Sequence, residues 1–329
     1  MDFDNDGDKD LISGSYDPGE IYLFRQNEDS EFGTRETIVD KNENPIVRVP
    51  DQHDSVESFG SWVTMVDWDN DGDQDLLIGG FDGSMFVRLN EAESGEPEFA
   101  TENISVMMGD EKLHVPGNHA TPVVADWDGD GMWDILTGSD NGGVYLFRNT
   151  GSKSDPKFEK EQILIEPHDG VGYSELLDRG QKPVPGIRSQ ISVFDYNQDG
   201  KLDLLLGDFC TTVSPRDDLT EKEYAEFHQV NSKIEKLTAD AKPFFDGIKK
   251  EFFEYSKQFS AEDLRDDKVQ EEVTKFYEEL YNSDQAKAYN DQLSELTEAM
   301  NSFLAKSPWN SMLEDTATPH GHVWLYLRK

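Results

Sequence analysis

The sequence has a single cysteine, Cys210, among 329 residues, which excludes a disulfide within the chain. No apolar run approaches the ~18 residues of a transmembrane helix, so we expect no membrane span. Basic residues are few: 30 Lys and Arg stand against 69 Asp and Glu, for a formal net charge of −39. A surface this acidic repels phosphate groups, which argues against nucleic acid as a partner.

Motifs of the common catalytic classes are also missing. The chain contains no nucleophile elbow, P-loop, zincin motif or dinucleotide-binding fingerprint. We therefore expect a protein that is not an enzyme. The thiol of Cys210 follows an apolar segment and is expected to pack as a small hydrophobic side chain.

Aspartate, by contrast, is abundant and falls into one pattern that occurs four times. The pattern reads D-x-[DN]-x-D-G-x-x-D followed by an apolar run that ends in Gly, and it occupies residues 2–14, 67–79, 126–138 and 195–207. Self-similarity of this kind indicates a modular array of repeated units.

The spacing within the pattern has a chemical meaning. Oxygen-bearing side chains at positions 1, 3 and 5, with Gly at position 6 for a sharp turn, are typical of a loop around Ca²⁺. An EF-hand also needs Glu at position 12, whereas here the last carboxylate stands at position 9. One such stretch could be an acidic surface turn, but four copies with the same spacing favour a metal loop. Position 7 varies freely, as expected if only its backbone carbonyl binds; it holds Asp8, Asp73, Met132 and Lys201.

Short β-prone segments flank the loops. "SWVTMV", "TPVVA" and "SQISVF" precede the last three loops, and "DLLIGG", "DILTG" and "DLLLG" follow their turns. A third alternating element comes next, as in "GVYLFRNT", and then a more variable fourth, as in "PEFATENISV". Each unit therefore predicts four antiparallel strands, and such units in series are the blades of a β-propeller. Two other kinds of Ca²⁺-loop array do not fit this sequence. A dockerin would need helices after the loops, and a thrombospondin-type array would need cysteines.

Together these features resemble FG-GAP/VCBS-type repeats, the Ca²⁺-bearing blades of integrin α-subunit propellers and of many secreted bacterial proteins. The resemblance covers about 1–210 plus the C-terminal strand, and it rests on the loops, because "FG" survives only as Phe59-Gly60. It implies up to four Ca²⁺ ions and an extracytoplasmic binding or adhesion protein. Besides the position-7 carbonyls, the implied ligands are Asp2, Asp4, Asp6, Asp10, Asp67, Asp69, Asp71, Asp75, Asp126, Asp128, Asp130, Asp134, Asp195, Asn197, Asp199 and Asp203.

The two ends of the chain are irregular. The first repeat begins on its first ligand without a preceding strand, and the final "HGHVWLYLRK" matches a third strand without a fourth. We expect an incomplete ring, truncated at its N-terminus, whose missing part could hold a signal peptide and further blades. A complete four-bladed ring is the alternative.

A long insertion interrupts the fourth repeat. Between 219 and 305 the only glycine is Gly247, and apolar residues follow helical three-four spacing in two arms. Thr220 and Glu223 form a capping box at the start. The pattern predicts an antiparallel helical hairpin with a coiled-coil-like seam, whose first arm breaks or kinks at Pro243 and whose second arm breaks at Ser283-Asp284.

The expected domains are therefore the blades, at 1–213 and 316–329, and the inserted hairpin at 214–315. The hairpin could be an arm that binds a partner. Alternatively, its apolar stripe is only the mutual core of the two arms.

Three residues stand at the same offset, seven positions before the first ligand of a loop: Gly60, His119 and Arg188. In a propeller such positions approach the central channel, so His119 and Arg188 are candidates for a ligand-binding rim, with a generic polar rim as the alternative. The sequence thus predicts a Ca²⁺-binding, non-catalytic extracytoplasmic scaffold for protein or carbohydrate ligands. The alternative is a fragment of a secreted carbohydrate-active enzyme resembling the polysaccharide lyases, which would need an aromatic and carboxylate cleft.

Overall fold

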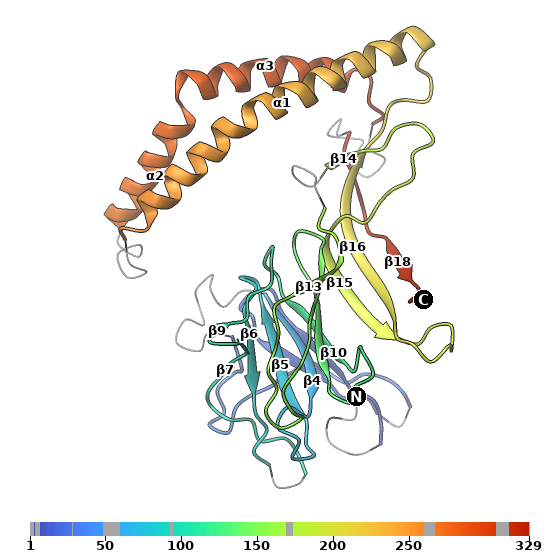
Figure 1. The fold of residues 1–329 in the computed structure, drawn as a ribbon, viewed down its shortest axis with the longest axis vertical. Coiled ribbons are helices and arrows are strands. Elements are labelled where there is room, and N and C mark those ends of the chain that lie inside the picture. The colour runs from blue at the N-terminus through green and yellow to red at the C-terminus, as the bar shows by residue number, and fades with distance from the viewer. Residues whose placement is uncertain are drawn as a thin grey trace. The chain divides into compact units, whose positions relative to one another are not determined.

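The computed structural model describes residues 3, 7–27, 29–48, 60–92, 95–168, 174–259, 267–306 and 316–328. The fold is mainly β, with several antiparallel sheets, and has a helical region towards the C-terminus (Figure 1). Two compact units are present: Met1–Ser174, Pro183–Thr211 and Pro319–Lys329 form the first, and Glu175–Lys182 and Thr212–Thr318 the second. The second unit thus includes 175–182, a segment that the sequence pattern assigns to the blades.

Four sheets follow one another along the chain and are numbered sheet 1 to sheet 4. Sheet 1 holds β1 (Leu11–Gly14), β2 (Ile21–Phe24) and β3 (Glu36–Thr37). Sheet 2 holds β4 (Ser61–Val66), β5 (Asp75–Gly80), β6 (Met85–Arg88) and β7 (Ile104–Ser105). Sheet 3 holds β10 (Thr121–Ala125), β11 (Asp134–Gly138), β12 (Val144–Phe147) and β13 (Gln162–Ile165). A separate pair, β8 (Met107–Met108) and β9 (Glu111–Lys112), lies between sheets 2 and 3 in chain order.

Sheet 4 is assembled from two distant parts of the sequence. Its strands are β14 (Ser174–Leu176), β15 (Ile187–Phe194), β16 (Asp203–Val213), β17 (Thr318–His320) and β18 (Val323–Tyr326). The C-terminal strand β18 pairs antiparallel with β16, so that Leu205 lies opposite Leu325. The C-terminal segment therefore occupies the place of a third strand, as its similarity to "GVYLFRNT" predicts.

The second, third and fourth aspartate loops each turn the chain between two neighbouring antiparallel strands. Asp75, Asp134 and Asp203, at position 9 of their loops, pair with the last residues of β4, β10 and β15. Sheets 2 and 3 then continue in the order β4-β5-β6-β7 and β10-β11-β12-β13. The predicted unit of strand, loop, strand, turn, strand and fourth strand is therefore observed in both.

Hydrophobic clusters combine residues from successive sheets. Ile21 and Leu23 of sheet 1 cluster with Leu76 and Ile78 of sheet 2. A second cluster joins sheets 2 and 3, and a third joins sheets 3 and 4. Because each sheet buries apolar residues against the next, the array is stabilised mainly by contacts between neighbouring repeats.

The glycine that ends each of the first three repeat patterns permits this close approach. A Cβ built on Gly79 would lie 2.1 Å from the backbone oxygen of Ala120, and one on Gly138 would lie 2.0 Å from that of Ser189. Real Cβ atoms are not found at such distances. The final Gly of the motif is thus required because the backbone of the following sheet lies against it.

The second unit contains the helices. Helix α1 (Glu221–Ser256) begins at the predicted capping box, with both reciprocal bonds between Thr220 and Glu223. Helices α2 (Asp267–Tyr281) and α3 (Asp284–Asn301) form the returning arm and are separated at the predicted position, where Ser283 caps α3. Pro308, at which the sequence predicts the end of the second arm, lies outside the described residues. Among the described residues, no helix is long and apolar enough to cross a membrane.

The first arm does not break at Pro243, since α1 continues through it as one helix, and a kink there stays a prediction. Proline in a helix interior costs about 3 kcal/mol. Packing beside it offsets this cost: the ring of Phe245 lies 4.9 Å from that of Tyr289 and 6.0 Å from that of Tyr281. Further along, Tyr255 stacks on Phe276 at 3.9 Å. The apolar stripe therefore forms a core between the two arms.

Asp178 and Arg179 contact the first turns of α1 within the second unit. The Tyr224 hydroxyl donates to Asp178, and His228 Nε2 lies 3.3 Å from the other carboxylate oxygen. The Arg179 guanidinium lies 4.4 Å from the Tyr224 ring centroid and donates to the carbonyls of residues 216, 217 and 219. These bonds explain why 175–182 belongs with the helices.

Candidate functional site

The second and third aspartate loops each bring three carboxylates together. In the second loop, oxygens of Asp67, Asp69 and Asp71 all lie within 4.8 Å of one another. The third loop repeats this arrangement with Asp126, Asp128 and Asp130. Positions 1, 3 and 5 of the motif therefore converge, as their spacing predicts. Oxygen ligands of this kind suit Ca²⁺.

Backbone geometry produces the convergence. Gly72 and Gly131, at position 6, have φ angles of 103° and 87°, in the left-handed region that a glycine adopts without strain. The position-5 carboxylate then accepts from the N–H two residues on: Asp73 N lies 3.0 Å from Asp71 Oδ1, and Met132 N lies 2.7 Å from Asp130 Oδ1. This local bond fixes the N–H of position 7 against the position-5 carboxylate, and ligation by the position-7 carbonyl stays a prediction.

The position-9 aspartates have a different environment from the converging ones. Both oxygens of Asp75 accept backbone N–H groups, from Trp68 at 2.8 Å and from Asn90 at 2.7 Å. All four position-9 side chains are buried. Each accepts a backbone N–H from the second residue of its loop and another from a residue just after the third strand of its repeat, which is β2, β6, β12 or β18. The four are Asp10, Asp75, Asp134 and Asp203. Each of these carboxylates therefore joins its loop to the third strand. Their ligation of a metal stays a prediction, which the second lone pair of each oxygen permits.

Charge is crowded in the second loop. Burial and the negative charges of Asp71, Asp69 and Asp67 raise the pKa of Asp73 to about 6. Burial also raises the pKa of Asp75 to about 7, although the two N–H bonds oppose this. The loop therefore holds more negative charge than it can stabilise alone, and a bound cation would relieve it.

Two buried carboxylate oxygens also indicate that the second loop suits a cation. Asp67 Oδ1 and Asp73 Oδ1 are buried without a hydrogen-bond partner among the described residues. A buried carboxylate oxygen without a partner costs free energy. Coordination of Ca²⁺ would remove that cost at Asp67, at motif position 1.

The other loops are less complete. Asp2, Asp4 and Asp6 of the first loop lie outside the described residues. In the fourth loop the Asn197 amide nitrogen lies 3.1 Å from Asp199 Oδ2, and Asp195 accepts from the N–H groups of Asp199 and Gly200. In the third, Arg148 lies 3.3 Å from Asp128 Oδ2 and would compete with a cation for that oxygen.

The proposed rim residues share a partner. His119 Nδ1 and Arg188 Nε lie 3.2 Å and 3.3 Å from the same oxygen of Asp140. The His119 side chain is buried between the rings of Trp62 and Phe81, at 5.3 Å and 4.0 Å, and burial lowers its pKa. His119 is thus buried, and ligand contact by His119 and Arg188 stays a prediction.

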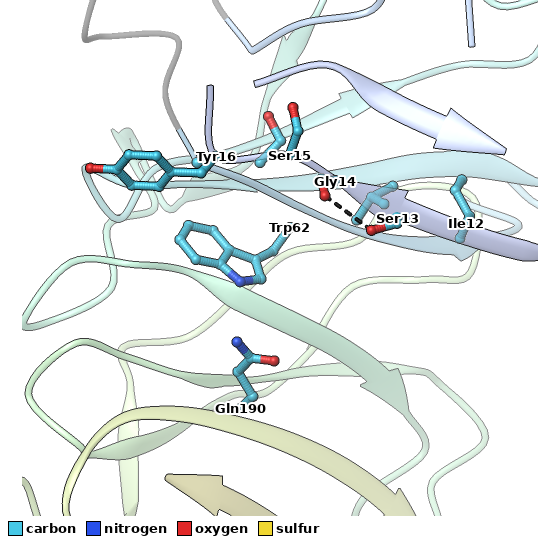
Figure 2. A pocket seen from close by; sticks show the side chains of 10 residues that line it. Ile12, Ser13, Gly14, Ser15, Tyr16, Trp62 and Gln190 are labelled. Carbon is cyan, nitrogen blue, oxygen red and sulfur yellow. Dashed lines mark hydrogen bonds between the residues drawn. The ribbon is translucent and has the colours of Figure 1, made fainter. Parts of the chain in front are cut away.

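A cavity of about 410 Å³ opens beside these residues within the first unit. Strands β1, β4 and β15 all contribute to its lining, and Figure 2 shows Tyr16, Trp62 and Gln190 along its wall. The buried hydroxyl oxygen of Ser15 also lines it and has no hydrogen-bond partner among the described residues. Aromatic faces, an amide and hydroxyl groups are therefore gathered at one site, and none of its described lining residues is Asp or Glu.

The asparagines after the third strands were missed by the sequence analysis. Asn90 donates its N–H to Asp75, and its side-chain oxygen accepts from Glu98 N at 2.8 Å. Asn149 does the same with Asp134 and Lys157. The recurring Asn at the end of "SMFVRLN" and "GVYLFRNT" was the available signal.

Comparison with known proteins agrees with the repeat pattern. A family model described as "FG-GAP-like repeat" matches the chain three times, at residues 2–78, 67–137 and 126–206. Each match starts at the first residue of one loop and ends in the strand after the next. A search of curated proteins finds no match.

Proposed function

Because the chain belongs to the FG-GAP-like repeat family, we propose that it is an extracytoplasmic, repeat-based scaffold that binds Ca²⁺ in as many as four loops. In this proposal the four sheets are blades of a β-propeller, and the protein binds a protein or carbohydrate ligand without catalysis. Family membership supports the extracellular setting, where repeats of this type are common.

The convergence of Asp67, Asp69 and Asp71 carries the Ca²⁺ proposal. When bound, the cation neutralises carboxylates that repel one another and connects both sides of the turn between β4 and β5. Asp75 then holds the loop against the third strand through its two N–H bonds. The metal and the position-9 aspartate would thus act together to keep the corner of the sheet in place.

The cavity beside Trp62 supports the binding of a ligand. The alternative, a carbohydrate-active enzyme, would need groups that transfer protons, and among the described lining residues the Tyr16 hydroxyl is such a group. The rings of Tyr16 and Trp62 offer apolar faces, while Gln190 and Ser15 offer polar groups, a combination that suits a sugar ring.

Terbium luminescence and calorimetry test the Ca²⁺ proposal. Tb³⁺ is a Ca²⁺ analogue excited through tryptophan, and Trp68 lies within the second loop. We expect Tb³⁺ emission that Ca²⁺ quenches, and calorimetric binding of Ca²⁺ that falls by one ion per chain in the Asp69→Asn/Asp71→Asn variant. Asp155→Asn, an exposed carboxylate outside the loops, should leave the stoichiometry unchanged. Absence of Ca²⁺ binding by the wild-type protein would refute the proposal.

A further inference from the structure

Strand β16 carries the only cysteine of the chain, and the C-terminal segment that pairs with it carries two histidines. β16 pairs with β17, which ends at His320, and with β18, which begins at Val323, one residue after His322 (Figure 1). Between these strands the N–H of Asp208 donates to the carbonyl of His322 at 3.1 Å. Cys210 and both histidines therefore lie in one part of sheet 4, within the first unit, although 112 positions separate Cys210 from His322.

The cysteine and one histidine lie at a distance that suits a shared metal ion. His322 Nδ1 is 3.9 Å from Cys210 Sγ. A tetrahedral Zn²⁺ ion with a Zn–S bond of about 2.3 Å and a Zn–N bond of about 2.0 Å holds its sulfur and nitrogen ligands about 3.6 Å apart. The observed separation exceeds that value by only a few tenths of an ångström, so a small side-chain shift lets one ion contact both atoms.

His320 offers a third ligand beside these two. The centroid of its ring lies 5.8 Å from that of His322, and the two ring planes differ by 30°. His320 is exposed, so its side chain is free to rotate toward the cysteine. Such a rotation is required, because among the described residues only the carboxylates of the aspartate loops already hold three ligand atoms within 4.8 Å of one another.

The surroundings of the thiol are polar rather than hydrophobic. Cys210 is 4% exposed, but it belongs to none of the four hydrophobic clusters among the described residues. The side chain of Asp208 is fully buried, and its Oδ1 lies 3.8 Å from His322 Nδ1. Its carboxylate accepts the backbone N–H groups of Gly186 and His322, both at 2.7 Å, and the indole N–H of Trp324 at 2.8 Å. This buried negative charge attracts a cation, and its bonds hold the backbone of His322 beside Cys210.

We propose that Cys210, His320 and His322 bind one Zn²⁺ ion, with a water molecule at the fourth position. A thiolate and two imidazoles are ligands that Zn²⁺ takes, whereas the aspartate loops offer oxygen, which suits Ca²⁺. The thiol releases its proton to solvent as the Zn–S bond forms. The ion joins β16 to the C-terminal segment, at the two points between which the chain passes through the second unit, and it thereby closes a long loop.

Cobalt substitution tests the proposal on the full chain, kept reduced and with excess Ca²⁺ to occupy the aspartate loops. Co²⁺ is a spectroscopic substitute for Zn²⁺, and a cobalt–thiolate bond gives a charge-transfer band in the near ultraviolet. We expect this band to saturate at one Co²⁺ per chain and to disappear when Zn²⁺ is added. Zn²⁺ should also slow the reaction of Cys210, the only thiol, with a thiol reagent, a measurement that needs no variant.

Single substitutions identify the ligands. Cys210→Ser should abolish the band, while His322→Gln and His320→Gln should each weaken Co²⁺ binding at least about tenfold, since the loss of even an outer-shell partner has an effect of that size. His114→Gln, at an exposed histidine outside the cluster, is the matched control and should bind Co²⁺ as the wild type does. Circular dichroism establishes that the variants are folded.

Four results would overturn the proposal. They are a wild-type protein without the band, a band that persists in Cys210→Ser, unchanged Co²⁺ affinity in either of the two ligand-histidine variants, and thiol reactivity that Zn²⁺ does not alter. The last of these is measured on the wild-type protein, so it decides the question even if a variant does not fold.

Discussion

Gly138 and Gly207 occupy the same place in successive repeats, but their surroundings differ. A Cβ on Gly138 would meet the backbone oxygen of Ser189 at 2.0 Å, whereas the nearest atom to a Cβ on Gly207 is Gln190 O at 3.8 Å. The repeat motif demands glycine at both positions, yet only the first has a neighbouring sheet that requires it.

We predict that Gly138→Ala destabilises the protein by at least 1–3 kcal/mol, roughly the cost of overpacking a core. Gly207→Ala, the matched control, should change the free energy of unfolding by less than about 0.5 kcal/mol. Urea unfolding followed by tryptophan fluorescence measures both. Equal losses in the two variants would show that the contact with Ser189 is not the reason for the glycine.

The carboxylates of the second loop predict an unusual pH dependence of the metal-free protein. The pKa of Asp75 is about 7 and that of Asp73 about 6, both above the ordinary value of 3.8. Between pH 4 and 7 the folded state therefore holds protons that the unfolded state releases, so the free energy of unfolding falls as pH rises through this window.

In excess chelator we expect a higher thermal midpoint at pH 5 than at pH 8. Added Ca²⁺ should raise the midpoint more at pH 8, because the cation competes with protons for the same oxygens. Asp73→Asn should weaken the pH dependence, because it removes one of the groups that titrate. If chelated protein were more stable at pH 8, the raised pKa values could not dominate its stability.

At the scale of elements, the helical arm has a hydrophobic cluster of its own, against which Leu176 of β14 and Val213 of β16 also pack. Phe227, Met300 and Leu304 form a cluster of their own in the second unit. Strand β16 ends at Val213 and β17 begins at Thr318, and both belong to sheet 4, so the ends of the insertion meet neighbouring strands. An insertion with adjacent ends and its own core can be removed without breaking the sheets.

Replacement of residues 214–318 by a short Gly/Asn turn should leave a folded protein that still binds Ca²⁺. Leu176 and Asp178 would lose their helical partners, so a modest fall in the thermal midpoint is expected. A Leu176→Ser/Asp178→Ser change in the shortened chain should reduce that loss by removing exposed apolar and acidic groups. Circular dichroism and Ca²⁺ calorimetry report the outcome. Unfolding, or loss of Ca²⁺ binding, would show that the arm contributes to the core of the sheets.

At the scale of the whole molecule, the net charge of −39 opposes a compact state. A Ca²⁺ site saturated at 100 times its Kd adds about 2.7 kcal/mol to the free energy of unfolding. Several such sites together would add about as much as the whole free energy of unfolding of a typical domain, which is roughly 5–15 kcal/mol.

We therefore predict that excess chelator lowers the thermal midpoint by many degrees relative to Ca²⁺-saturated protein at neutral pH. The Asp69→Asn/Asp71→Asn variant should show a smaller difference, because one site is lost. Mg²⁺ in place of Ca²⁺ is a suitable control, since it dehydrates reluctantly and suits these loops less well. Equal midpoints with Ca²⁺ and with chelator would contradict a structural role for the metal.

Local sequence was sufficient for the loops, the strand order of a repeat and the ends of the helices. The Asp and Gly spacing specifies a turn through bonds between residues two apart, such as Asp71 with Asp73, and the capping box of Thr220 acts over three residues. The spacing at which apolar side chains recur distinguishes strands from helices for the same reason, because that spacing is set by the residues of a single element.

Only the tertiary structure decided the rest. Asp75 meets Asn90, and Gly138 meets Ser189, because folding brings together segments whose separation no motif encodes. Pro243 is tolerated because Phe245 packs on the opposite arm, and residues 175–182 join the helical unit through contacts with Tyr224. Whether an apolar face is covered likewise depends on which sheet lies beside it, so the exposure of Val323 could not be read from a strand whose sequence resembles the buried ones.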